Sequence, residues 1–148
     1  MNNTFNSSVQ DPYELRVQEK LNKIFPDIYE GIEGIVKLQE HIAFKVLTIL
    51  VEYACIGQNT TPIVLARNKI KKIPSDWLVQ HFPKVIQSSI NVEDEWEYSR
   101  LMELIIETAP QLVQDYVELG LASINEEVRE AAEDIAKMFS RESNATDL

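Results

Sequence analysis

Cysteine, glycine and histidine are scarce in this 148-residue chain, and each scarcity excludes a class of site. The single Cys55 cannot build an internal disulfide framework, which favours a reducing compartment. Only four glycines are present, and the sequence contains no glycine-rich loop of the kind that binds a phosphate group. The two histidines, His41 and His81, have no spacing typical of metal ligands. We therefore expect no metal and no cofactor.

Long apolar runs are also missing. The most apolar stretch, residues 42–56, is fifteen residues long and contains Lys45 and Glu52, whereas a span across a bilayer needs roughly twenty apolar residues. Residues 1–10 are polar and uncharged, without the basic start and apolar run of a signal peptide. We expect a cytoplasmic protein that does not associate with membranes.

Positive charge is the third scarcity. Fourteen Lys and Arg stand against twenty-four Asp and Glu, which gives a net charge of -10 and opposes general binding to nucleic acid. Residues 1–90 carry ten basic and nine acidic side chains, whereas residues 91–148 carry four and fifteen. The C-terminal part therefore predicts an acidic surface that attracts a basic partner, although a merely solubilising surface would have the same composition.

Helix signals fill the chain between residues 11 and 139, and no stretch shows sustained strand alternation. Capping residues, prolines and glycines mark the ends of the helices. The predicted helices are 12–24, 32–56, 61–72, a short segment from Ser75, 83–89, 93–109, 110–121 and 126–139. We predict an all-α fold with one helical domain at 11–139, between a disordered arm at 1–10 and a disordered tail at 140–148.

A short internal repeat lies within this pattern. Ser89-Ile90-Asn91 recurs as Ser123-Ile124-Asn125 after a shift of 34 residues. Apolar positions in the helices that follow recur at the same shift, since Leu101 falls on Ile135. Because a helical hairpin cannot cover its own apolar face, we expect like hairpins to stack and to bury that face between them.

The last helix resembles the second half of a HEAT-type repeat. Such a half-repeat has a short polar cap residue, then Val-Arg, then small residues that permit close helix packing. The matching residues here are Asn125, Val128, Arg129, Ala131 and Ala132. The resemblance extends over residues 75–139 at most, and the preceding helix departs from it at Trp96, Glu97 and Tyr98. It implies a short stack of antiparallel helical hairpins that serves as a protein-binding scaffold.

No motif for catalysis is present. The chain lacks a Gly-x-Ser-x-Gly element and a Cys-His signature, and Cys55 stands in an apolar run that predicts an inert thiol. Acidic residues at 93–95 and 126–127 complement the positive end of a helix dipole without any further role. A general acid or base would need a buried carboxyl with a shifted pKa. We therefore predict that the protein is not an enzyme.

The favoured function is a protein-interaction module whose acidic C-terminal surface binds a basic protein, with an inhibitor or immunity-type protein as one form. Trp96 is surrounded by acids and is expected at the surface, whereas Trp77 and Tyr98 are expected in the core. The predicted partner-binding residues are Glu93, Glu95, Trp96, Glu97, Glu130 and Glu133.

Two alternatives remain open. One is a small-ligand binder or enzyme that uses a buried carboxylate in a groove between helices. The other is self-association, in which an exposed basic helix face meets the acidic end of a second copy. That basic face consists of Arg67, Lys69, Lys71 and Lys72.

Overall fold

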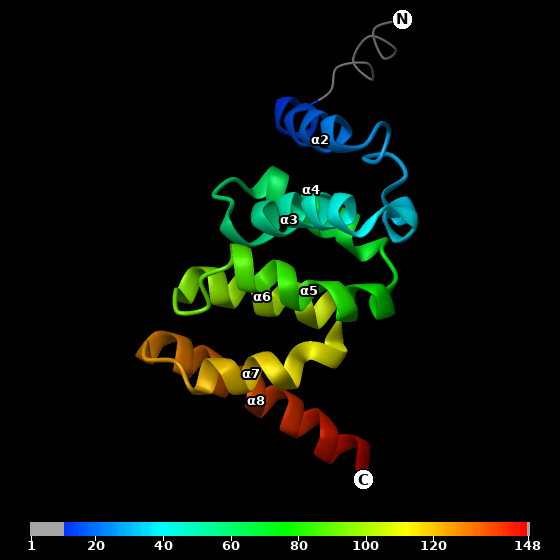
Figure 1. Ribbon diagram of the computed structural model, residues 1–148. Helices are drawn as coiled ribbons and strands as arrows, with labels where there is room; N and C mark the ends of the chain where they lie inside the picture. The colour runs from blue at the N-terminus through cyan, green and yellow to red at the C-terminus, as the bar shows by residue number, and fades with distance from the viewer. Residues whose placement is uncertain (1–10, 148) are drawn as a thin grey trace, which may run out of the picture. The chain divides into compact units, whose positions relative to one another are not determined.

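The computed structural model describes the backbone of residues 11–147 and the side chains of residues 11–140 (Figure 1). Every regular element in that part of the chain is a helix, which confirms the predicted all-α class. The predicted arm at 1–10 lies outside the described residues. The chain groups into two compact units, which we call unit 1, ending at Pro74, and unit 2, beginning at Ser75.

The described part of unit 1 contains three α-helices that contact one another pairwise: α2 (Pro12–Ile24), α3 (Glu40–Ile56) and α4 (Thr60–Lys71). Asp11 caps α2 as predicted, because its carboxylate accepts a hydrogen bond of 2.7 Å from the Tyr13 amide. The core of unit 1 is built mainly from α3, where Leu47 and Leu50 are among several fully buried side chains.

The predicted long helix at 32–56 is wrong. Residues Ile32–Lys37 form a separate 3-10 helix (η1), and α3 begins only at Glu40. Leu38 between them is extended, with a ψ of 155°. Gly31 and Gly34 lower the helix propensity of this stretch, so an uninterrupted α-helix is not favoured there.

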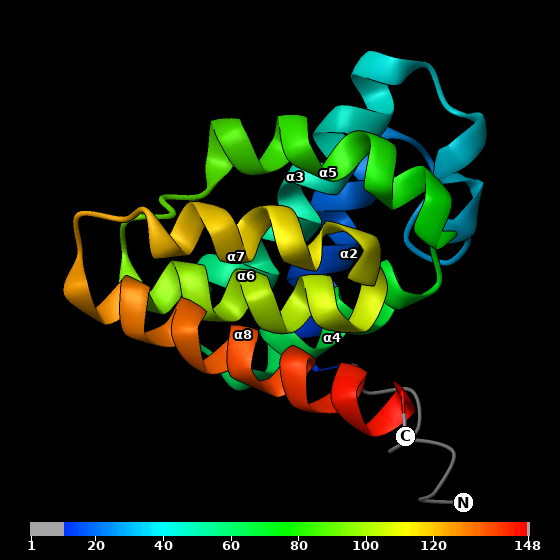
Figure 2. The same ribbon diagram turned by 90° about the horizontal axis from the view of Figure 1, so that it is seen from below.

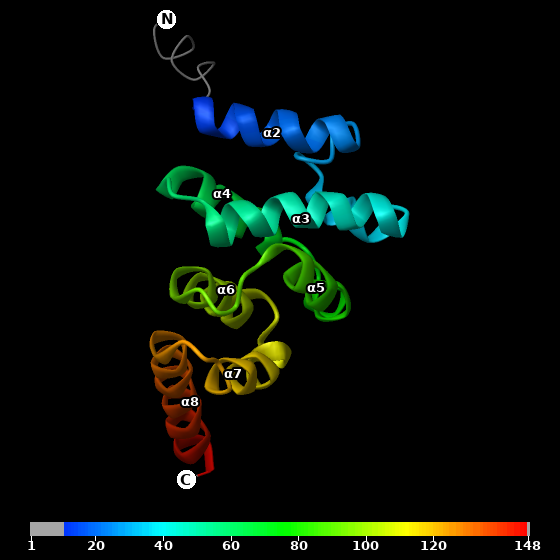
Figure 3. The ribbon, with the colours of Figure 1, turned by 60° about the vertical axis from the view of Figure 1, so that its left-hand side comes forward.

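Unit 2 comprises α5 (Ser75–Ser89), α6 (Glu95–Thr108), the 3-10 helix η2 (Pro110–Leu112), α7 (Val113–Leu121) and α8 (Glu126–Asp147). Helix α6 contacts both α7 and α8, and α7 packs along α8 (Figure 3). Most of the apolar face of α6 is fully buried, including Leu101, Leu104 and Ile105.

Gly120 lets α6, α7 and α8 approach closely. A Cβ at this position would lie 2.5 Å from Cζ of Tyr98 and 2.8 Å from Cβ of Ala132. The Tyr98 side chain is fully buried here, and its hydroxyl donates a hydrogen bond of 2.9 Å to the Tyr116 carbonyl oxygen. Glycine is therefore required at 120 by packing between helices, since only a position without a side chain leaves room for the phenol.

Two predicted boundaries in unit 2 are wrong. Helix α5 runs through Pro83, where a new helix was expected, because its buried Leu78, Phe82, Val85 and Ile86 offset the hydrogen bond that proline cannot donate. Helix α8 continues to Asp147 rather than ending at 139. Residues 140–147 contain neither glycine nor proline, so an established helix can propagate through them. None of the described helices has the length and apolar content needed to cross a bilayer.

Candidate protein-interaction surface

Two loops of unit 2 lie side by side at one end of α6 and α8 (Figure 2). One loop precedes α6, and the other joins α7 to α8. The Ser123 hydroxyl donates a hydrogen bond to the Glu93 carboxylate, and Asn125 Nδ2 donates one of 2.9 Å to the Glu93 carbonyl oxygen. We call residues 90–96 and 121–127 the loop-end surface.

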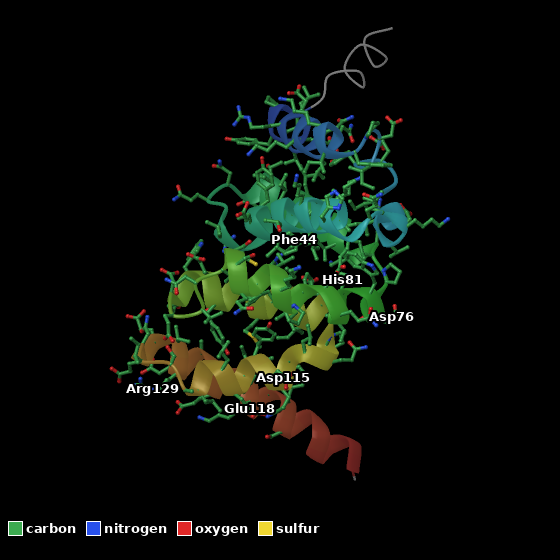
Figure 4. All side chains as sticks on the ribbon, viewed as in Figure 1. Phe44, Asp76, His81, Asp115, Glu118 and Arg129 are labelled. Carbon is green, nitrogen blue, oxygen red and sulfur yellow. The ribbon has the colours of Figure 1, made fainter. Side chains whose placement is uncertain are left out.

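The two loops share one local conformation. Asn91 Oδ1 accepts a hydrogen bond of 3.0 Å from the Glu93 amide, and Asn125 Oδ1 accepts one of 2.9 Å from the Glu127 amide. Each asparagine thus bonds the backbone two residues ahead, which is an Asx turn. Arg129 fixes the second loop further, since its Nη1 donates a hydrogen bond of 2.8 Å to the Ser123 carbonyl oxygen (Figure 4). The repeated Ser-Ile-Asn sequence therefore marks two turns of the same kind.

Glu97 belongs to the cap of α6. The Asp94 carboxylate accepts a hydrogen bond of 2.9 Å from the Glu97 amide, while Glu97 Oε1 accepts one of 2.9 Å from the Asn91 amide. A capping box would place the Glu97 carboxylate on the Asp94 amide, whereas here it bonds the loop three residues before the N-cap, and the Asp94 amide donates to the Asn91 carbonyl oxygen. One oxygen of each of the Glu93 and Glu97 carboxylates, two of the predicted partner-binding residues, therefore accepts a hydrogen bond within unit 2 that helps to fix the loops.

Trp96 is 52% exposed, whereas Tyr98 is fully buried, so the expected placement of both residues is confirmed. The Arg100 guanidinium lies 4.1 Å from the centroid of the Trp96 ring. Arg100 follows one helical turn after Trp96, which puts the two side chains on the same face of α6. The indole therefore already makes the cation–π contact that a basic partner would offer.

Ile124 was not singled out from the sequence as a binding residue, yet it is 89% exposed. The equivalent Ile90 in the first loop is only 8% exposed. Leu121, the last residue of α7, is also exposed. The 34-residue shift could have drawn attention to Ile124, because it pairs this residue with Ile90 in the repeated Ser-Ile-Asn sequence.

Acidic side chains surround these apolar residues. Glu93, Asp94, Glu126 and Glu127 are exposed, and Glu95 is half-buried. From residue 75 onward the sequence has five basic and sixteen acidic side chains, against nine and eight before it, so the whole excess of negative charge belongs to unit 2. The predicted Glu130 and Glu133 are exposed on α8 but lie about one to two turns beyond the loop end. Three of the six predicted residues, Glu93, Glu95 and Trp96, thus lie in the loop-end surface, and Glu97 follows it directly.

The expected core position of Trp77 is wrong, because its side chain is only half-buried; the indole stacks on His81, with the ring centroids 3.9 Å apart and the planes at 14°. His81 Nδ1 lies 2.7 Å from the Trp77 carbonyl oxygen (His81 is labelled in Figure 4). Because a carbonyl oxygen only accepts, this nitrogen carries the hydrogen. Among the described residues, no group of three His, Cys, Asp or Glu side chains could hold a metal ion.

The expected exposed basic face in unit 1 is wrong at Lys69, which is buried. Its Nζ donates a hydrogen bond of 2.6 Å to the Tyr29 carbonyl oxygen and lies 3.7 Å from the centroid of the Tyr29 ring. Burial, and secondarily the charge of Lys72, lowers the pKa of Lys69. The Tyr29 hydroxyl in turn donates a hydrogen bond of 2.7 Å to Glu14, so Lys69 belongs to a structural network.

Every Asp and Glu side chain described between residues 11 and 140 is exposed or half-buried, whereas the enzyme alternative required a buried carboxylate. Comparison of the chain with family models, curated proteins and solved structures finds no match.

Proposed function

We propose that unit 2 is a non-enzymatic protein-interaction module whose loop-end surface binds a basic protein partner. The supporting observation is that two exposed apolar side chains, Trp96 and Ile124, stand among acidic residues on two joined loops. Protein interfaces commonly combine an apolar or aromatic centre with a polar rim, and tryptophan is enriched among the residues that carry binding energy.

The negative net charge of unit 2 indicates that its partner is positively charged. A surface with a large excess of carboxylates attracts a basic protein at long range and raises the rate of encounter. The Arg100–Trp96 contact supports a more specific role, in which an arginine or lysine of the partner packs against the same indole. An inhibitor or immunity-type protein is one form of this function, and a cytoplasmic setting fits the single, buried Cys55.

Affinity capture with the full chain tests this proposal. An extract of the encoding organism is passed over the immobilised protein at about 50 mM salt and again at about 300 mM, which shortens the range of electrostatic attraction. We expect a basic protein to be retained at low salt and released at high salt. Trp96→Ala and Ile124→Ser should each reduce its retention, because both are exposed apolar side chains of the proposed binding surface.

The matched control removes charge elsewhere on unit 2. Asp115 and Glu118 are exposed on α7, away from the loop end (Figure 4), and the pair Asp115→Asn and Glu118→Gln removes two carboxylates. The proposed surface is supported if the double variant at Asp115 and Glu118 still retains the basic protein while Trp96→Ala and Ile124→Ser do not. Equal loss in both would show that net charge alone binds the partner, and absence of any retained basic protein at low salt would refute the function.

A further inference from the structure

A pocket opens in unit 1 between α2 and the C-terminal half of α3. Its volume is about 340 Å³, which lies at the lower end of the range typical of small-molecule sites. The lining residues are Lys20, Ile49, Glu52, Tyr53, Ile56 and Gly57. We propose that this pocket binds an alkylammonium group, that is, an organic cation with a short apolar chain. The proposal concerns unit 1 and does not depend on the loop-end surface of unit 2.

The floor of the pocket suits an alkyl chain. Ile49, Tyr53 and Ile56 follow one another at spacings of three and four residues, which places them on one face of α3. Ile49 and Tyr53 are half-buried, and Ile56 is 39% exposed. A ligand that covered this stripe would remove apolar surface from water, which favours binding.

The electrostatics of the pocket favour a cation at its polar end. The face of the Tyr53 ring carries partial negative charge, and the exposed Glu52 carboxylate lies next to it in the sequence. The C-terminus of α3, at Ile56, contributes the negative end of the helix dipole, and the last turn contains no basic residue that would neutralise it. All three features attract an ammonium group and repel a carboxylate.

Lys20 shows that an ammonium can reach the ring. Its Nζ, from α2, lies 5.3 Å from the centroid of the Tyr53 ring, within the range of a cation–π contact. Lys20 is exposed, so its side chain can swing into water when a ligand arrives. A ligand cation therefore competes with Lys20, whereas a ligand anion would require Lys20 as its partner. This difference in sign makes Lys20 the deciding residue.

The experiment is an NMR titration of the full chain with n-butylammonium and, separately, with butyrate. We expect butylammonium to shift the amide signals of residues 49–57 and butyrate to leave them in place. Lys20→Gln should tighten butylammonium binding by about two- to fivefold, and Glu52→Gln should weaken it by about as much. Lys23→Gln is the matched control, because it removes the same charge from an exposed position on α2 outside the pocket.

The tyrosine ring gives a second readout. Tyr53→Phe keeps the aromatic face and should retain binding, whereas Tyr53→Leu should abolish it while circular dichroism confirms that the helices remain. An acetylated and amidated Ala-Lys-Ala peptide distinguishes the sources of the cation: shifts with this peptide as well as with butylammonium assign the pocket to lysine side chains, and shifts with butylammonium alone assign it to free amines.

Three results would overturn the proposal. One is binding of butyrate that is lost in Lys20→Gln, since the site would then recognise anions. Another is weaker butylammonium binding in Lys20→Gln than in Lys23→Gln. The third is the absence of localised shifts with butylammonium and with the lysine peptide alike.

Discussion

Gly120→Ala tests the packing on which unit 2 depends. The added methyl group would collide with the Tyr98 hydroxyl and lie 2.5 Å from Cζ of the same ring and 2.8 Å from Cβ of Ala132, and the fully buried phenol has no flexible end that could move aside. Overpacking of this kind costs about 1–3 kcal/mol, and displacement of the Tyr98 phenol endangers its hydrogen bond, worth about 1 kcal/mol. The higher helix propensity of alanine stabilises the helix by about 1 kcal/mol and offsets part of this cost. We expect a net loss of about 1–3 kcal/mol in the free energy of unfolding.

Thermal and denaturant unfolding followed by circular dichroism measure this loss, which corresponds to a midpoint lowered by about 3–10 °C. The matched control is Gly34→Ala, because no atom lies within 4 Å of the position that its Cβ would take. In the double variant with Tyr98→Phe, removal of the hydroxyl should relieve part of the collision, so the two effects should not add. A Gly120→Ala protein as stable as Gly34→Ala would refute the packing argument.

Three further predictions concern stability. Lys69→Met should lower the free energy of unfolding by about 1–3 kcal/mol, because the Tyr29 carbonyl oxygen loses its hydrogen-bond donor. The control is Lys72→Met at an exposed position, measured in the same denaturant titration. Equal losses of stability in the two variants would contradict the prediction. Burial raises the pKa of Tyr98 from 10.0 to about 12. The free energy of unfolding should therefore keep its full value below pH 10 and fall by about 2–3 kcal/mol towards pH 12, because the phenol ionises over this range more readily in the unfolded chain than in the folded one. The loss of stability at high pH should be smaller in Tyr98→Phe. Identical pH profiles of stability for Tyr98→Phe and the unmodified protein would contradict the prediction. Ser123→Ala should cost about 0.5–1.5 kcal/mol by removing one of the two hydrogen bonds that join the loops, and an unchanged unfolding midpoint would show that this bond does not contribute to stability.

Features set by neighbouring residues could be predicted from the sequence. Asp11 and Pro12 begin a helix as expected, and Asn125 turns the chain before α8. Both are local effects, because a short polar side chain bonds the backbone two or three residues ahead. Periodicity likewise predicted the all-α class, since apolar residues recur at helical spacing throughout the described chain.

Features set by distant residues could not be predicted in this way. Lys69 is buried because the Tyr29 carbonyl oxygen and ring receive its ammonium, and these residues are 40 positions apart. Its own sequence context, with Lys71 and Lys72 nearby, indicated an exposed basic face. The break before α3 was missed for a similar reason, since an uninterrupted apolar pattern does not reveal where a 3-10 helix replaces an α-helix.

The candidate site combines both kinds of feature. Net charge is additive along the chain, so a count of residues located the acidic half without any structure. The role of each carboxylate depends on its hydrogen bonds, and the predicted Glu93 and Glu97 also join and cap the loops, which their charge alone did not indicate. Sequence alone therefore located the region of the surface but not the separate roles of its acidic residues.

The proposed interaction consequently assigns attraction and recognition to different side chains. Exposed charges act over about 8–10 Å at moderate salt and bring a basic protein close without fixing its orientation. Orientation requires contacts that exclude water, and Trp96 and Ile124 are the large apolar side chains on the loop-end surface that are more than half exposed. Replacing acids there should therefore slow association, while replacing Trp96 or Ile124 should speed dissociation, and stopped-flow kinetics with the captured partner would separate the two effects.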